Sequence, residues 1–306
     1  MALISPEAPQ CLSADLAEEQ DGFRLAWWNT SLNPPRTKGV SAKDPVSVYA
    51  GLDRLLEVAD VVFLGETLIS KEIVDAVNRF NRKHSSFVGR REFVIDYRRG
   101  DAENSKFHTL CLYDPSSFKT DKDCKVGDWL KMSDDELSKY YRIGQRYDFF
   151  SEFLGKTISF YVVHWSQYSE EDGEAMKMLA AHRLRSCMEG YDSLPIICLG
   201  DFNCEPYAKA LATLGAARSE EYVLSRGGLF NPFWDFLGCH AGSIASENTR
   251  FLKTKSPVFD QILVNKALLM RQGFEFRFRI MDGSIYEPTR GEHHPVMMSI
   301  VSRKGG

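Results

Sequence analysis

The stretch PIICLGDFN, residues 195–203, decides the fold. Its apolar first part is typical of a strand that is buried on both faces. A glycine, a carboxylate, an aromatic ring and an amide follow at once, and the alternation of extended chain places Asp201 and Asn203 on the same side. A buried strand that ends in such polar groups predicts a rigid edge that carries a functional site.

Three other apolar runs end in the same way. The run AWWN ends at Asn29, VVFLG is followed by Glu66, and YVVH ends at His164. Groups at strand ends can converge at one edge of a scaffold, and hard oxygen ligands among them suit Mg²⁺. Taken alone, Asn29 or Glu66 is better interpreted as a polar residue that caps a loop.

Helical and strand patterns alternate along both halves of the chain. The spacing of apolar residues predicts helices over 45–59, 71–83 and 170–190, and a short helix is expected at 129–141, inside a polar surface excursion. Strands are expected at 23–29, 61–65, 195–200, 258–265, 274–280 and 295–301, and an aromatic loop at 229–238. This order predicts two sheets packed face to face with helices outside, an α/β sandwich. Residues 1–22 are expected to form a tail and 23–306 a single domain.

The composition restricts the function classes. With 306 residues, 43% hydrophobic and 26% charged, the chain is ordinary for a globular protein. A net charge of −4 argues against a protein that coats nucleic acid, but leaves room for a nuclease with a local basic rim. Seven cysteines without a C-x-x-C pair favour a reducing compartment. The absence of a leader or a long apolar segment predicts a cytoplasmic protein without stable membrane association.

The strand-end motifs together resemble a known family. The ordered set WWN, LGET, VVHW, GDFN, FDQILV and GEHHPV spans residues 23–301 and resembles the endonuclease/exonuclease/phosphatase superfamily, in particular its deoxyribonuclease-I-like branch. The resemblance implies a four-layer α/β sandwich with two mixed β-sheets packed face to face. It also implies hydrolysis of phosphate esters with Mg²⁺, for which Mn²⁺ can substitute.

The resemblance implies a metal site. Glu66 would be the main metal-binding carboxylate, and Asn29 and Asp201 would complete the metal and phosphate side. The family has an Asp before its catalytic histidine, whereas this chain has Glu292, which we assign to the metal site with a longer side chain. A second departure is Gly65, which stands where the family has Gln, and we expect it to change packing rather than chemistry.

The resemblance also implies a catalytic set. Asp201 and Asn203 would hold and orient the attacking water, a second metal ion or the phosphate. His293 would pair with Asp260, and His164 would act as the second acid or base. This fits the chemistry, because ester hydrolysis needs an in-line water, neutralised phosphoryl oxygens and a proton for the leaving oxygen.

Substrate contacts are expected from four residues. Arg146 matches an arginine that contacts phosphate in the deoxyribonuclease-like branch, and Asn203 would assist it. Phe233 and Trp234, in the aromatic loop, are candidates for stacking on bases or sugars.

The preferred function is that of a DNA endonuclease with nucleic acid as its partner. The alternatives are a phosphatase or phosphodiesterase for a small-molecule, lipid-derived or RNA phosphate ester, and a catalytically inactive binding module of the same fold.

Overall fold

The structure of the protein is a computed structural model. It describes residues 22–32, 45–67, 71–84, 92–96, 109–120, 126–134, 139–165, 170–189, 193–237, 242–244, 257–281 and 293–303. Within this part of the chain, no helix is long and apolar enough to cross a membrane.

The first sheet is mixed and has the strand order β13-β14-β1-β2-β4-β3 in the described residues. Its two central strands, β1 and β2, run parallel, and the other pairs are antiparallel. The strands are β1 (Gly22–Asn29), β2 (Val61–Gly65), β3 (Val94–Asp96), β4 (Thr109–Tyr113), β13 (Phe274–Ile280) and β14 (Val296–Ser302).

The second sheet is also mixed, with the order β10-β11-β12-β9-β8-β7-β5, and β6 pairs with β7. Here β8 and β9 run parallel, while β12 and β9 are antiparallel. The strands are β5 (Phe118–Lys119), β6 (Val126–Asp134), β7 (Lys139–Ser151), β8 (Lys156–His164), β9 (Ile196–Asp201), β10 (Ala216–Ala217), β11 (Leu229–Phe230) and β12 (Asp260–Asn265).

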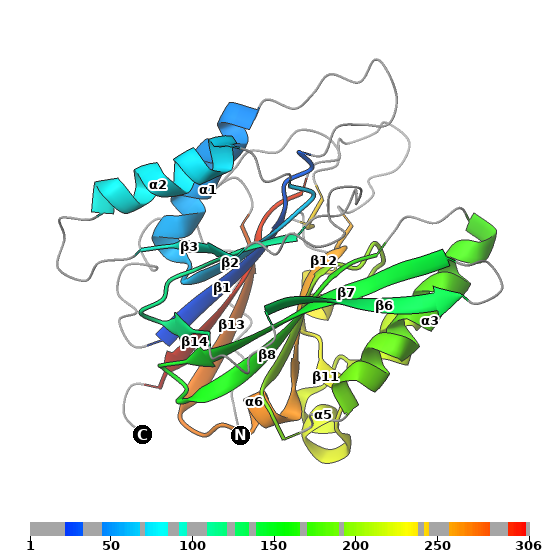
Figure 1. Cartoon of the computed structure of the whole chain (residues 1–306). Helices are drawn as coiled ribbons and strands as arrows, with labels where there is room; N and C mark the ends of the chain where they lie inside the picture. The colour runs from blue at the N-terminus through cyan, green and yellow to red at the C-terminus, as the bar shows by residue number, and fades with distance from the viewer. Residues whose placement is uncertain are drawn as a thin grey trace.

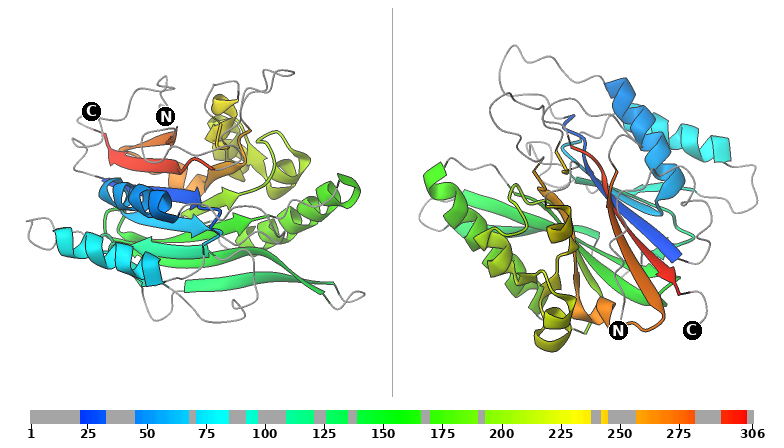
Figure 2. Two further views of the ribbon diagram at one scale, coloured as in Figure 1. Left: turned by 90° about the horizontal axis from the view of Figure 1, so that it is seen from above. Right: turned by 180° about the vertical axis from the view of Figure 1, so that it is seen from behind.

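The two sheets pack face to face, and helices cover both outer surfaces (Figures 1 and 2). The central core joins Trp27 and Phe63 of the first sheet to Phe160 and Leu199 of the second. A second core lies between the first sheet and α1 (Pro45–Val58) with α2 (Lys71–His84). A third lies between the second sheet and α3 (Glu170–Glu189) with α4 (Lys209–Leu214). The predicted four-layer α/β sandwich is therefore confirmed.

The excursion after Asp114 differs from the sequence prediction. The short helix expected at 129–141 was wrong, because β6 ends at Asp134 and β7 begins at Lys139, and the two strands pair antiparallel. Helix propensity is a weak preference that tertiary context overrides, and pairing with β7 satisfies the backbone of a polar strand. A turn joins β7 and β8, and Gly155 adopts φ 60° in it.

Further short helices accompany the strands of the second sheet. They are α5 (Glu220–Arg226), the 3₁₀ helix η2 (Pro232–Phe236) and α6 (Lys266–Leu269). Figure 1 shows α5 and α6 together at one end of the sandwich.

Candidate active site

Strand register brings the predicted site residues to one level. In the first sheet, Asn29 pairs with Gly65, so that Glu66 follows beside it. In the second sheet, Asp201 pairs with His164 on one side and with Asp260 on the other. The ends of five strands thus present their polar groups at the same edge of the sandwich.

The alternation of side chains turns these groups toward one another. Trp27 and Leu199 lie in the core between the sheets, and residues two positions further along a strand share the same face. Asn29 and Asp201 therefore point from opposite sheets into the same space. Asn29 is 1% exposed and Asp201 is 2% exposed, so the site is held in a buried setting.

The Asn29 amide connects the two sheets. Its Nδ2 lies 3.1 Å from Glu66 Oε1, 3.1 Å from Asp201 Oδ2 and 3.4 Å from His293 Nε2. Its Oδ1 accepts a hydrogen bond of 3.0 Å from the Ser31 backbone N–H. One amide is therefore in contact with three of the predicted site residues.

His293 is held by Asp260. The distance from His293 Nδ1 to Asp260 Oδ2 is 2.6 Å, and the indole N–H of Trp27 donates to Asp260 Oδ1 at 2.8 Å. A carboxylate at Nδ1 fixes the imidazole ring and directs Nε2 toward Asp201, whose Oδ2 is 3.9 Å away.

The electrostatics of the pair follow from burial and charge. Although burial lowers the pKa of His293, the carboxylates of Asp260, Asp201 and Glu66 raise it to about 9. Burial raises the pKa of Asp260, and its contacts with His293 and Trp27 oppose that rise. The buried proton is best placed on His293, because an imidazolium beside a carboxylate is stabilised by the opposite charge.

His164 and Asn203 complete the cluster on the second sheet. His164 Nε2 lies 3.4 Å from Glu66 Oε1 and 3.7 Å from Asp201 Oδ2. The Asn203 backbone N–H donates to Asp201 Oδ1 at 2.8 Å, and Asn203 Nδ2 donates to the Trp165 carbonyl at 2.6 Å. Asn203 and Glu66 both have φ 48°, an uncommon backbone conformation that clusters at functional sites.

The remaining predicted residues lie elsewhere or outside the described part. Arg146 is 6% exposed and its Nε donates to Asp148 Oδ1 at 2.9 Å, so a role in phosphate binding stays a prediction. Glu292 lies outside the described residues. Trp234 is half-buried in η2. The expectation that Phe233 contacts substrate was wrong, because its ring is fully buried against Phe236 and Phe278.

Sequence reasoning missed the role of Trp27. A Cβ atom added at Gly65 would lie 2.4 Å from Cη2 of the Trp27 ring. The indole can occupy its place beside Asp260 only because residue 65 has no side chain. The sequence showed that glycine replaces the family's Gln at this position. Only the structure shows that this glycine makes room for the Trp27 ring.

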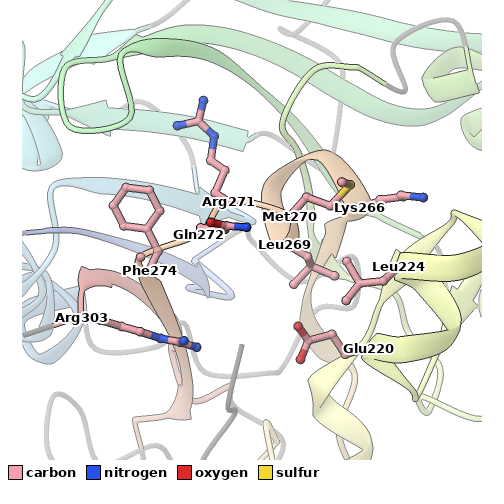
Figure 3. A pocket seen from close by; sticks show the side chains of 10 residues that line it. Glu220, Leu224, Lys266, Leu269, Met270, Arg271, Gln272, Phe274 and Arg303 are labelled. Atoms are coloured by element: carbon pink, nitrogen blue, oxygen red, sulfur yellow. The ribbon is translucent and has the colours of Figure 1, made fainter. Parts of the chain in front are cut away.

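A cavity of about 310 Å³ lies at the opposite edge of the sandwich. It is lined by residues that include Lys266, Arg271, Phe274 and Arg303, and Figure 3 shows Arg303 and Glu220 reaching into it from opposite sides. Phe274 pairs with the last residue of β14, whereas His293 precedes the first. The cavity is therefore separate from the cluster around Asp201.

The chain is similar to a known protein family in sequence and to solved structures in fold. A model of the endonuclease/exonuclease/phosphatase family matches residues 110–294. No curated protein matches the chain. Three similar solved structures are D. rerio TDP2 complexed with single strand DNA product, the human Nocturnin catalytic domain and a Bacteroides thetaiotaomicron mannosyl-6-phosphatase.

These structures are distant in sequence. TDP2 is 14% identical with a TM-score of 0.57, covering 92% of this chain and 99% of that chain. Nocturnin is 14% identical with a TM-score of 0.58, covering 92% and 95%. The phosphatase is 15% identical with a TM-score of 0.57, covering 91% and 99%. At such identities the likeness concerns the fold.

Proposed function

The chain belongs to the endonuclease/exonuclease/phosphatase family, and from this premise we propose that it is a divalent-metal-dependent phosphodiesterase, an endonuclease that hydrolyses DNA. Members of the family are phosphate-ester hydrolases, and they commonly use divalent metals. The finer assignment rests on the side chains of this site.

One observation carries the proposal. Two histidines approach the same carboxylate oxygen, Asp201 Oδ2, with Nε2 of His164 at 3.7 Å and Nε2 of His293 at 3.9 Å. Two such groups supply both proton transfers that hydrolysis needs, one from the attacking water and one to the leaving oxygen.

Each residue then has a role in the proposal. Asp201 and Asn203 orient the attacking water or the phosphate. His293, whose proton is retained by the Asp260 carboxylate, stabilises the charge that develops on the phosphoryl oxygens and donates a proton. His164 is the second acid or base.

The residues around Asn29 fit a Mg²⁺ ion. Glu66 and Asp201 offer carboxylate oxygens 3.1 Å from the same Asn29 amide atom, and neighbouring ligands of octahedral Mg²⁺ lie about 2.9 Å apart. The Asn29 oxygen accepts a hydrogen bond from the Ser31 backbone N–H, and Asn29 would have to turn and give up that bond to place its oxygen at that position. When bound, the ion would neutralise phosphoryl charge and activate water.

A set of Asp201, Asp260 and His293 also has ligand atoms within 4.8 Å of one another. We prefer the position at Glu66 and Asp201, because both oxygens of Asp260 already accept hydrogen bonds. Glu292 is proposed as a further ligand that adjoins His293 in the chain.

DNA as the substrate is supported by TDP2, whose similar structure holds a single strand DNA product. Sugar-phosphate hydrolysis is the second candidate, favoured by the similar mannosyl-6-phosphatase structure and by the net charge of −4. We further propose a cytoplasmic location, because thiols remain reduced in that compartment. Four cysteines of the described residues are free thiols: Cys111, Cys187, Cys198 and Cys204.

Plasmid cleavage tests the proposal. Purified protein is incubated with supercoiled plasmid and Mg²⁺ or Mn²⁺, beside an EDTA lane, a His293→Ala variant and a His182→Ala variant that changes an exposed histidine on α3. We expect metal-dependent nicking by the wild type and by His182→Ala, and none by His293→Ala. Absence of nicking together with release of phosphate from mannose 6-phosphate would replace the endonuclease by the phosphatase.

A further inference from the structure

Two aromatic side chains, the exposed Tyr207 and the half-buried Trp234, form a pair. Tyr207 is 62% exposed, and its ring lies 6.3 Å from the ring of Trp234 at an interplanar angle of 61°. The Arg218 guanidinium lies 6.0 Å over the Trp234 ring and 3.5 Å from Asp235 Oδ1. The pair therefore offers a partly exposed aromatic surface, with a guanidinium beside it that is paired with a carboxylate.

The strand register places this pair at the catalytic edge. Tyr207 follows Asp201 by six residues. β11 is the neighbour of β12 and runs antiparallel to it, so that β11 runs toward the end of β12 that carries Asp260. The helix η2 follows β11 in the chain and carries Trp234. The two rings thus approach each other from segments that flank the same strand ends.

The Gln261 side chain holds both segments together. It is fully buried, its Nε2 donates to the Cys204 carbonyl at 2.9 Å, and its Oε1 accepts from Asn231 Nδ2 at 2.8 Å. Cys204 precedes Tyr207 on its loop, and Asn231 is the N-cap of η2. The pair is therefore positioned by a residue adjacent to Asp260.

The pair does not lie between the two sheets. Gln261 and Asp260 are neighbours on one strand and point to opposite faces, and Asp260 points to the first sheet. Tyr207 and Trp234 consequently lie toward the outer face of the second sheet, which is the face turned away from the first sheet. A group that contacts them must belong to a part of the substrate away from the reacting phosphate.

We propose that Tyr207, Trp234 and Arg218 form a stacking surface for an unpaired base of the substrate strand, away from the reacting phosphate. The inference rests on the proposed function in taking a nucleic acid strand as the substrate. Bases stack on exposed aromatic faces regardless of sequence, and an adjacent guanidinium attracts the phosphates that link them. The enzyme accordingly prefers substrates with a single-stranded stretch to fully paired DNA.

Binding measurements test the surface directly. Fluorescence anisotropy in EDTA gives the Kd of a labelled DNA strand of about 12 nucleotides for the wild type, Tyr207→Ala and Tyr207→Phe. Tyr222→Ala is the matched control, because Tyr222 is 56% exposed and lies on α5, at the other end of the sandwich. Since a stacked base contributes about 1 to 3 kcal/mol, Tyr207→Ala should weaken binding roughly 5- to 150-fold. Tyr207→Phe and Tyr222→Ala should stay within about twofold of the wild type.

An unchanged Kd for Tyr207→Ala, or an equal loss for Tyr222→Ala, overturns the stacking surface. The result is distinguishable from failure of the proposed function, which is measured separately as metal-dependent cleavage of plasmid DNA by the wild type. Cleavage with an unchanged Tyr207→Ala Kd refutes the surface alone. A Tyr207-dependent Kd without any cleavage supports the surface and refutes the nuclease.

Discussion

Replacing Gly65 by alanine tests the arrangement that holds Asp260. The added Cβ would lie 2.4 Å from Cη2 and 2.7 Å from Cζ2 of Trp27, whereas carbon atoms in contact are about 3.5 to 4.0 Å apart. The indole must therefore move by about 1 Å or more. Its 2.8 Å hydrogen bond to Asp260 would then exceed normal hydrogen-bond length.

Two effects add in the Gly65→Ala variant. Overpacking of a core costs about 1 to 3 kcal/mol, and loss of a hydrogen bond to a charged acceptor costs about 1.5 to 3 kcal/mol. We expect the free energy of unfolding to fall by about 2.5 to 6 kcal/mol. Urea unfolding, followed by circular dichroism, should show a lower midpoint with an unchanged slope.

A double-mutant cycle with Trp27→Phe identifies the cause. The atoms nearest to the added Cβ belong to the six-membered ring of the indole, and phenylalanine does not extend as far. The double variant should therefore be more stable than the sum of the two single effects by about 1 kcal/mol or more. A Gly65→Ala variant as stable as the wild type, or strict additivity in the cycle, would refute the reasoning.

Three further predictions concern the site. The pKa of His293 in the folded protein is about 9, above the ordinary value of 6.5. Its contribution to the free energy of unfolding is therefore complete below about pH 6.5 and is lost as the pH rises through about 9. The metal-free protein should lose on the order of 3 kcal/mol of stability over this range, as seen by urea unfolding, and His293→Gln should lack the slope. Asp201→Asn should lower kcat about 100-fold or more, and because both Asp201 oxygens accept hydrogen bonds it should also lower the free energy of unfolding by about 1 to 3 kcal/mol; a fully active variant would remove Asp201 from the mechanism. Glu292→Gln should raise the Mg²⁺ concentration for half-maximal activity several-fold, and an unchanged titration would assign Glu292 a structural role.

The sequence predicted much of the fold, because its signals are local. Periodicity located α1, α2 and α3 closely, and the apolar runs that end at Asn29 and Asp201 marked β1 and β9. The family motifs then predicted the sandwich, and the register explains why groups far apart in the chain meet. To predict those contacts, the exact first and last residues of each strand are not required. It is enough that the ends of the strands lie at a common edge.

Other features depend on contacts that no local pattern contains. The polar strand β6 is formed by pairing with β7, and helix propensity suggested the opposite. The burial of Phe233 and the exposure of Tyr207 depend on how η2 and the loop after Asp201 fold back over the second sheet. Likewise, the glycine at position 65 acquires meaning only when Trp27 is seen beside it.

The position of β14 has a consequence for damaged copies of the protein. This strand lies inside the first sheet, between β13 and β1, and the residue that reaches the site, His293, stands just before it. A proteolytic cut that detaches β14 would expose the unpaired edge of β1 and withdraw the imidazole in the same event. Loss of β14 would thus remove the proposed catalytic histidine and weaken the first sheet at the same time.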